Sequence, residues 1–113
     1  MELKDERVGE ISVVTVTGRL DGGASDAFAA RVGGLLDGAT KPKLLIDLAG
    51  VDFVSSAGLR AVLTIVKKIK ASGGAFVLCG LQDPVREVLD ISGFTPMLSI
   101  HGSRADGLAA LGG

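Results

Sequence analysis

Two adjacent hydroxyls, Ser55 and Ser56, stand between an apolar run and the start of a helical pattern. The run at residues 44–48 is typical of a buried strand, and the apolar spacing of residues 57–72 predicts a helix. Backbone N–H groups at a helix start have no partner within the helix, and the helix dipole is positive there. A serine in this place can cap the helix, act as a nucleophile or accept a phosphoryl group.

The nucleophile reading needs a general base and an acid that orients it. The chain has one histidine, His101, far along the sequence from the serines. The segment Phe53–Gly58 also lacks the first glycine of the Gly-x-Ser-x-Gly turn, and no phosphate-binding glycine loop is present. A small hydrolase using Ser56 is therefore a minor hypothesis, which predicts ester turnover that Ser56→Ala abolishes.

The sequence gives little support for a metal site or a disulfide bond. The one cysteine, Cys79, lies in an apolar run and is expected to be a buried thiol on a strand. Asp21, Asp47 and Asp52 are the acids expected near the serines. Asp47 is expected to end a strand, whereas Asp21 is either solvated in a loop or contacts a Mg²⁺ that a partner's nucleotide carries. No cofactor or metal of its own is expected.

Composition narrows the class of protein further. The 113 residues, 47% hydrophobic and 22% charged, are enough for one folded domain spanning residues 1–113. A net charge of −1 and the absence of Tyr and Trp argue against nucleic-acid binding. No apolar run is long enough to cross a membrane and the first residues lack a signal-peptide core, so a cytoplasmic protein is expected.

The periodicity predicts alternating strands and helices. The expected strands are residues 1–8, 11–17, 43–48, 75–79 and 98–101, the first two as a hairpin. The expected helices are residues 26–36, 57–72, 83–91 and 105–111. Their expected N-caps are Ser25, Ser56, Asp83 and Ser103. This alternation indicates a mixed α/β sheet with right-handed crossovers.

Four ordered segments carry a resemblance that covers nearly the whole chain. They are Gly18–Asp21, Leu45–Phe53, Ser55–Leu59 and Asp90–Phe94. They resemble the Gly-x-Leu-Asp turn, central strand, phosphorylation motif and late helix end of the STAS family, the anti-sigma factor antagonists. The resemblance implies a single domain with a curved mixed β-sheet of four to five strands and about four helices packed mainly on one face.

The same resemblance implies a binding switch that is not an enzyme. Its unphosphorylated form would bind an anti-sigma factor that is a serine kinase with an ATP-binding fold, and so release a sigma factor. The kinase would phosphorylate the motif serine, and a metal-dependent serine phosphatase would reverse this. The alternative is a STAS regulator of a non-sigma kinase–phosphatase module in secretion, motility or transport. A monomer is expected, because no long exposed apolar helix face demands a dimer.

By position, the resemblance assigns the phosphoacceptor to Ser56, with Ser55 as the competing acceptor. Ser55 occupies a place where many members have Asp, and Ala57 replaces a second hydroxyl residue. Phosphorylation would add about −1.5 to −2 charges, which a helix start tolerates and a docked partner does not. Capping by Ser56 is compatible with this role. The residues expected to bind the partner are Asp21, Ser55, Ser56, Gly58, Leu59 and Arg60.

Overall fold

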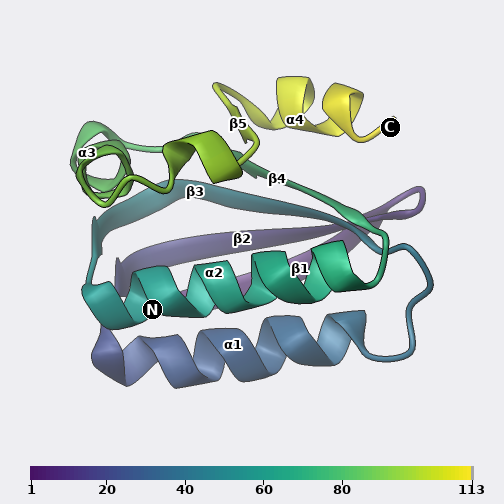
Figure 1. The fold of residues 1–113 in the computed structure, drawn as a ribbon, viewed down its shortest axis with the longest axis horizontal. Coiled ribbons are helices and arrows are strands. Elements are labelled where there is room, and N and C mark those ends of the chain that lie inside the picture. The colour runs from purple at the N-terminus through teal and green to yellow at the C-terminus, as the bar shows by residue number, and fades with distance from the viewer. Residues whose placement is uncertain (113) are drawn as a thin grey trace.

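A computed structural model describes residues 1–112 of the chain. Its strands are β1 (Glu2–Val8), β2 (Ile11–Leu20), β3 (Lys43–Val54), β4 (Ala75–Cys79) and β5 (Ile100–His101). Its helices are α1 (Gly22–Leu36), α2 (Ser56–Ala71), α3 (Asp83–Ile91) and α4 (Arg104–Ala110), with a 3₁₀ turn η1 (Thr95–Met97). The predicted alternation of strands and helices is confirmed (Figure 1).

The five strands form one mixed sheet in the order β1-β2-β3-β4-β5. β1 runs antiparallel to β2, and Val8 pairs with Ile11 across a tight turn in which Gly9 has a φ of 61°. The predicted hairpin is therefore confirmed. The other neighbouring strands are parallel, so the carboxyl ends of β2, β3 and β4 point to the same edge of the sheet.

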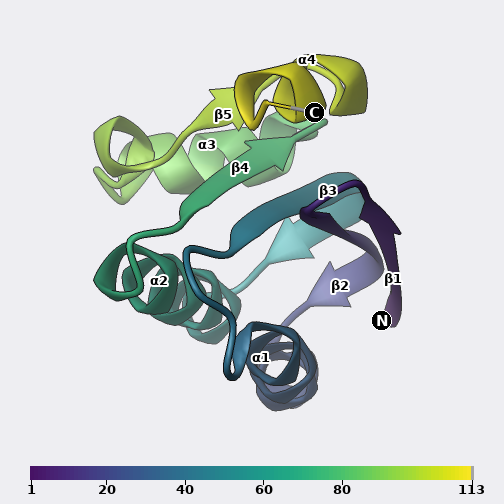
Figure 2. The same ribbon diagram turned by 90° about the vertical axis from the view of Figure 1, so that its right-hand side faces the viewer.

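Helices cover the two faces of the sheet unequally. α1, α2 and α3 each contribute buried apolar residues to the larger core on one face, whereas Leu108 and Leu111, in and just after α4, cover the other (Figure 2). In β3, Leu44 and Ile46 enter the larger core and Leu45 enters the smaller one, which explains three apolar residues in succession. The expected packing mainly on one face is confirmed. Within residues 1–112, no helix has the length and apolarity needed to cross a membrane.

The starts of α1 and α3 both differ from the sequence prediction. α1 begins at Gly22 with Asp21 as its N-cap, whose Oδ1 accepts the N–H of Ala24 at 3.1 Å. Ser25, the predicted cap, is buried in the first turn and its Oγ donates to the carbonyl of Gly22 at 3.0 Å. For α3, the N-cap is Gln82 rather than Asp83. Ser103 caps α4 as predicted, accepting the N–H of Asp106 at 3.1 Å.

Three strand ends also differ. β2 continues to Leu20 and β3 to Val54, because these two ends pair with each other beyond two irregularities in the ladder. Asp47 therefore lies within β3 and does not end it. The last strand is only Ile100–His101, because η1 occupies Thr95–Met97 just before it.

Candidate functional site

The two serines occupy different positions at the start of α2. Ser55 is the N-cap, with extended backbone angles, and its Oγ accepts the N–H of Gly58 at 3.1 Å. Ser56 is the first helical residue and is exposed. The prediction that Ser56 caps the helix is wrong by one residue. Because Ser55 satisfies the cap, the Ser56 hydroxyl is not needed to hold the helix start.

Substitution of the two serines separates these roles. We expect Ser55→Ala to lower the free energy of unfolding by about 1 kcal/mol, because the N–H of Gly58 loses its acceptor. The matched variant Ser56→Ala is expected to stay within about 0.5 kcal/mol of the parent protein. Urea denaturation followed by circular dichroism measures both. Equal losses of stability in the two variants would show that Ser55 is not the N-cap of α2.

The end of β2 holds this helix start in place. The backbone N–H of Ser55 donates to the carbonyl of Leu20 at 3.0 Å, and its Oγ lies 3.5 Å from the same oxygen. A Cβ added to Gly58 would come within 2.2 Å of that carbonyl oxygen. Only glycine therefore allows α2 to approach β2 so closely. Since Asp21 follows Leu20 directly, the starts of α1 and α2 lie at the same edge of the sheet (Figure 1).

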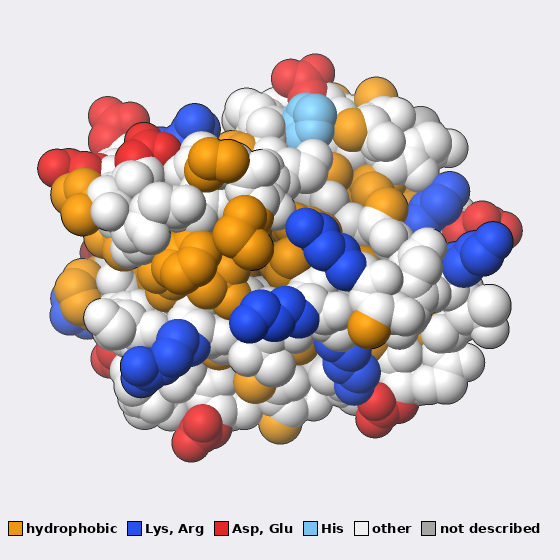
Figure 3. Space-filling view, in the orientation of Figure 1, with side chains coloured by type: hydrophobic (Ala, Val, Ile, Leu, Met, Phe, Trp, Pro, Cys, Tyr) orange, Lys and Arg blue, Asp and Glu red, His pale blue; other side chains and the backbone are white. Residues whose placement is uncertain are grey.

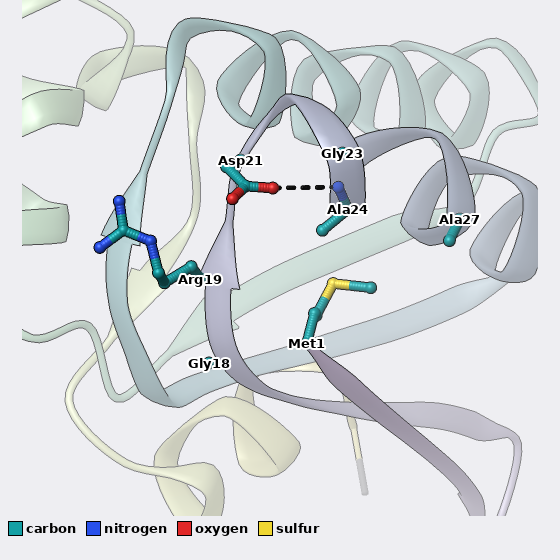
Figure 4. A pocket seen from close by; sticks show the side chains of 7 residues that line it. All are labelled: Met1, Gly18, Arg19, Asp21, Gly23, Ala24 and Ala27. Atoms are coloured by element: carbon teal, nitrogen blue, oxygen red, sulfur yellow. Dashed lines mark hydrogen bonds between the residues drawn. The ribbon is translucent and has the colours of Figure 1, made fainter.

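Asp21 has a role that the sequence prediction missed. Its carboxylate caps α1 and borders a hollow of about 640 Å³ (Figure 4). The lining residues are Met1, Gly18, Arg19, Asp21, Gly23, Ala24 and Ala27. An Asp placed directly before a helical segment is a strong N-cap signal, but the two glycines after Asp21 made that segment read as a loop.

The remaining expected site residues divide between core and surface. Leu59 is buried and Gly58 is pressed against β2, so both position the helix. Arg60 is exposed four residues after Ser56, on the same side of α2. The structure thus gathers Asp21, Ser55 and Ser56 at one edge and adds Arg60 one helical turn further along.

Asp47 and His101, two of the groups considered for chemistry, lie away from the serines. Asp47 pairs across the ladder with Cys79, and Cys79 with His101. β3 then runs seven residues further before the serines, a span of about 20 Å. His101 is therefore out of reach of Ser56 as a general base. Within residues 1–112, no group of three or more His, Cys, Asp or Glu side chains is placed to hold a metal ion.

Cys79 is buried, as predicted. Burial, followed by the negative charge of Asp47, raises the pKa of its thiol to about 11. The thiol is therefore protonated at neutral pH, and a protonated buried thiol is a poor nucleophile and metal ligand. Cys79 is a packing residue of the smaller core.

Asp47 belongs to an ion-pair cluster that sequence reasoning missed. Arg104 donates to Oδ2 of Asp47 through Nε at 3.2 Å and a terminal guanidinium nitrogen at 3.1 Å. The same guanidinium reaches Glu6 at 2.9 Å and Thr15 Oγ1 at 2.6 Å. These contacts tie the start of α4 to β1, β2 and β3. Asp47 therefore serves the attachment of α4 and is not part of the serine site.

Comparison with known proteins agrees with this fold. The family model for the STAS domain matches residues 2–107. BtrV of Bordetella bronchiseptica, provisionally named an anti-sigma factor antagonist, is 31% identical over 110 residues, which are 97% of this chain and 94% of that protein.

Solved structures similar to this one include an anti-sigma-factor antagonist (STAS) domain protein from Planctomyces limnophilus, with a TM-score of 0.90, 23% identity and 98% coverage of both chains. The phosphorylated form of SpoIIAA, a cell fate determinant of Bacillus, has a TM-score of 0.74 and 22% identity over 96% of this chain and 98% of that one. At these identities the two structures establish a shared fold alone. The family model spans most of the chain and the BtrV match spans nearly all of it, so the chain belongs to the STAS domain family.

Proposed function

We propose that this protein is an anti-sigma factor antagonist whose binding to its partner is switched off by phosphorylation of Ser56. The family and the name of the relative BtrV support the class of function. The single observation that supports the switch is that the two serines have different structural roles. Ser55 provides the N-cap through Gly58, which leaves the neighbouring hydroxyl of Ser56 exposed.

The position of Ser56 suits a phosphate. A phosphoserine at the first helical residue adds about −1.5 to −2 charges next to the positive end of the α2 dipole, so the helix tolerates it. The Ser55 cap is left intact by the modification. A partner docked on α2 would have to strip water from this dianion, which is unfavourable without a pairing cation. Affinity then falls while the domain keeps its fold.

The local geometry also favours Ser56 over Ser55 as the acceptor. Ser55 is only partly exposed, and its Oγ is occupied by the N–H of Gly58 and lies 3.5 Å from the carbonyl of Leu20. Phosphorylating Ser55 would remove the hydroxyl proton that it donates to Leu20 and would bring phosphate oxygens against that carbonyl oxygen. Ser56 is exposed, so a phosphate on its hydroxyl can extend into solvent.

The proposed cycle involves two further proteins. The anti-sigma factor is a serine kinase with an ATP-binding fold, and a metal-dependent serine phosphatase restores the binding form. The protein itself acts in the cytoplasm as a monomer and catalyses no reaction. Asp21 and Arg60 would contribute charges to the partner-binding surface, whereas Ser55, Gly58 and Leu59 would hold α2 in the binding position.

The assignment is tested by incubating the protein with its candidate kinase and ATP and mapping the phosphate by mass spectrometry. We expect a single phosphate on Ser56 and none in the Ser56→Ala variant. Phosphate on Ser55 or on any other residue, or no phosphate, would contradict the assignment.

A phosphomimetic variant tests the effect on binding. We expect Ser56→Asp to weaken binding to the anti-sigma factor by about tenfold or more, as measured by calorimetric titration. The variant should remain folded by circular dichroism, because an acid suits the first turn of a helix. Thr40→Asp is the matched control. It adds the same charge in the exposed loop before β3, at the opposite edge of the sheet, and should leave the affinity unchanged. Unchanged affinity of Ser56→Asp would contradict the proposal that a negative charge at this position weakens binding.

A further inference from the structure

An apolar groove lies between α2 and η1, on the surface that also carries Arg60. Its volume is about 360 Å³. The lining residues are Arg60, Leu63, Thr64, Lys67, Phe94 and Met97. Figure 3 shows hydrophobic side chains gathered above α2 and bordered by Lys and Arg side chains along that helix. Contiguous apolar surface with a polar rim is typical of a protein-binding site.

Two residues of the groove are held by packing, and a third can change its side-chain conformation. Leu63 and Phe94 are partly buried and pack against the larger core, so they are held in place. Met97, in η1, is 48% exposed. An exposed methionine is unbranched and polarizable, which suits it to irregular apolar partners. Met97 belongs to neither core cluster, so its exposed thioether is available to a partner beside Leu63 and Phe94.

The charged residues that line the groove have one sign. Arg60 and Lys67 line it, and Lys70 lies beside it with Nζ 3.4 Å from the carbonyl oxygen of Met97. None of the lining residues is acidic. Asp90, at the end of α3, is engaged by Thr95 Oγ1 at 2.6 Å and by Arg86 Nε at 3.3 Å. The groove therefore offers apolar contacts flanked by cations, and its complement is apolar flanked by carboxylates.

The spacing along α2 indicates the form of the complement. Arg60, Leu63, Thr64 and Lys67 follow one another at three, one and three residues, so they form a stripe along one side of the helix. This stripe covers about two helical turns, or about 10 Å. A groove of this length beside a helix accommodates another amphipathic helix, which anchors through residues at the same spacing.

We propose that this groove binds an acidic amphipathic helix of the partner protein. Apolar residues of that helix contact Leu63, Phe94 and Met97, and its carboxylates pair with Arg60 and Lys67. The identity of the partner as an anti-sigma factor rests on the proposed function. Because Arg60 follows Ser56 by one helical turn, a partner that fills the groove also approaches the phosphoacceptor.

The test uses two synthetic amphipathic peptides of about four helical turns. One carries a Leu stripe with Glu on the other positions, and the second replaces every Glu with Lys. Each is titrated into isotopically labelled protein and followed by NMR at backbone amides and at the Met97 methyl. We expect the Glu peptide to shift the groove residues in a saturable way and the Lys peptide to leave them unshifted.

Three variants define the specificity of binding. Met97→Glu and Lys67→Glu should each weaken binding of the Glu peptide by about tenfold or more. Both positions are exposed, so these variants should remain folded. Arg7→Glu, on exposed β1, makes the same charge change as Lys67→Glu away from the groove and should change the affinity by less than about twofold.

Several results would overturn the proposal. They are equal binding of the Lys peptide, shifts confined to other surfaces, full affinity in Met97→Glu and Lys67→Glu, or groove shifts that depend on protein concentration alone. Shifts that depend on protein concentration alone would show that a second copy of this chain occupies the groove. The experiment needs neither the kinase nor a phosphate, so its outcome is independent of whether Ser56 is the phosphoacceptor.

Discussion

Gly58→Ala is expected to lower the free energy of unfolding by about 3 kcal/mol, although alanine is ordinarily the better helix former. The added Cβ would lie 2.2 Å from the carbonyl oxygen of Leu20 and 3.0 Å from the carbonyl carbon. These are backbone atoms of a paired strand, so they cannot rotate away as a side chain would. The first turn of α2 must instead move away from β2, and the hydrogen bond from Ser55 to Leu20 is strained or lost.

Gly34→Ala is the matched control for this prediction. Gly34 lies within α1, and a Cβ there would meet no atom within 4 Å. We expect this variant to gain about 0.5–1 kcal/mol of stability, because alanine loses less backbone entropy in a helix. Guanidinium denaturation measures both variants. If Gly58→Ala were also stabilising, the close contact between α2 and β2 would not exist in solution.

Phe28→Ala is expected to lower the free energy of unfolding by about 3–5 kcal/mol. Phe28 is the largest apolar side chain that α1 contributes to the core, and it is 0% exposed. α1 also contains Gly33 and Gly34 in its interior, each of which weakens an isolated helix by about 1 kcal/mol. Packing against the sheet, rather than helix propensity, must therefore hold this helix.

Phe53→Ala removes the same atoms at the surface and serves as the control. Phe53 is 38% exposed, and its ring lies 4.1 Å from the guanidinium carbon of Arg19. We expect Phe53→Ala to lower the free energy of unfolding by about 1 kcal/mol, chiefly through loss of that cation–π contact. The two variants are compared by urea denaturation at the same pH. Similar losses would mean that α1 is not anchored by Phe28.

The consequences of Phe28→Ala should reach the serine site. The start of α1 carries the Asp21 cap, and this start lies beside the start of α2 because Leu20 contacts Ser55 and Gly58. Loosening α1 should increase amide hydrogen exchange at Ala24, whose N–H the cap accepts. The edge of the sheet that presents Ser56 thus depends on packing some distance from it.

The cap position accounts for a serine at position 55. By the motif resemblance noted in the sequence, Ser55 takes a place where many members of the family are expected to have Asp. Ser and Asp are about equally good N-caps, because both side chains accept a backbone N–H in the first turn. Here Ser55 makes that contact with Gly58. The substitution therefore preserves the start of α2 while removing one negative charge from beside Ser56.

The sequence by itself determined the features that depend on local pattern. Apolar periodicity predicted the order of strands and helices, and the density of apolar residues in β3 predicted a strand covered on both faces. The Ser103 cap and the burial of Cys79 followed from residue type and immediate neighbours. The resemblance to the STAS family was readable for the same reason, since its motifs are short and ordered along the chain.

Only the tertiary structure decided which residue caps each helix start at the serine edge. β2 and β3 extend to Leu20 and Val54 because they pair with each other, and this pairing makes Asp21 and Ser55 the caps. Local pattern placed both caps later, at Ser25 and Ser56, because it contains no information about where a partner strand ends.

The cluster of Arg104 with Asp47 and the groove between α2 and η1 also arise from the fold. Arg104 and Asp47 are 57 residues apart, and Met97 lies 30 residues beyond Lys67 in the chain. No periodicity spans such separations, so these contacts exist only once the sheet and the crossovers bring the segments together. The serine pair was visible in the sequence, but the division into a capping Ser55 and an exposed Ser56 was made by the contact of α2 with the end of β2.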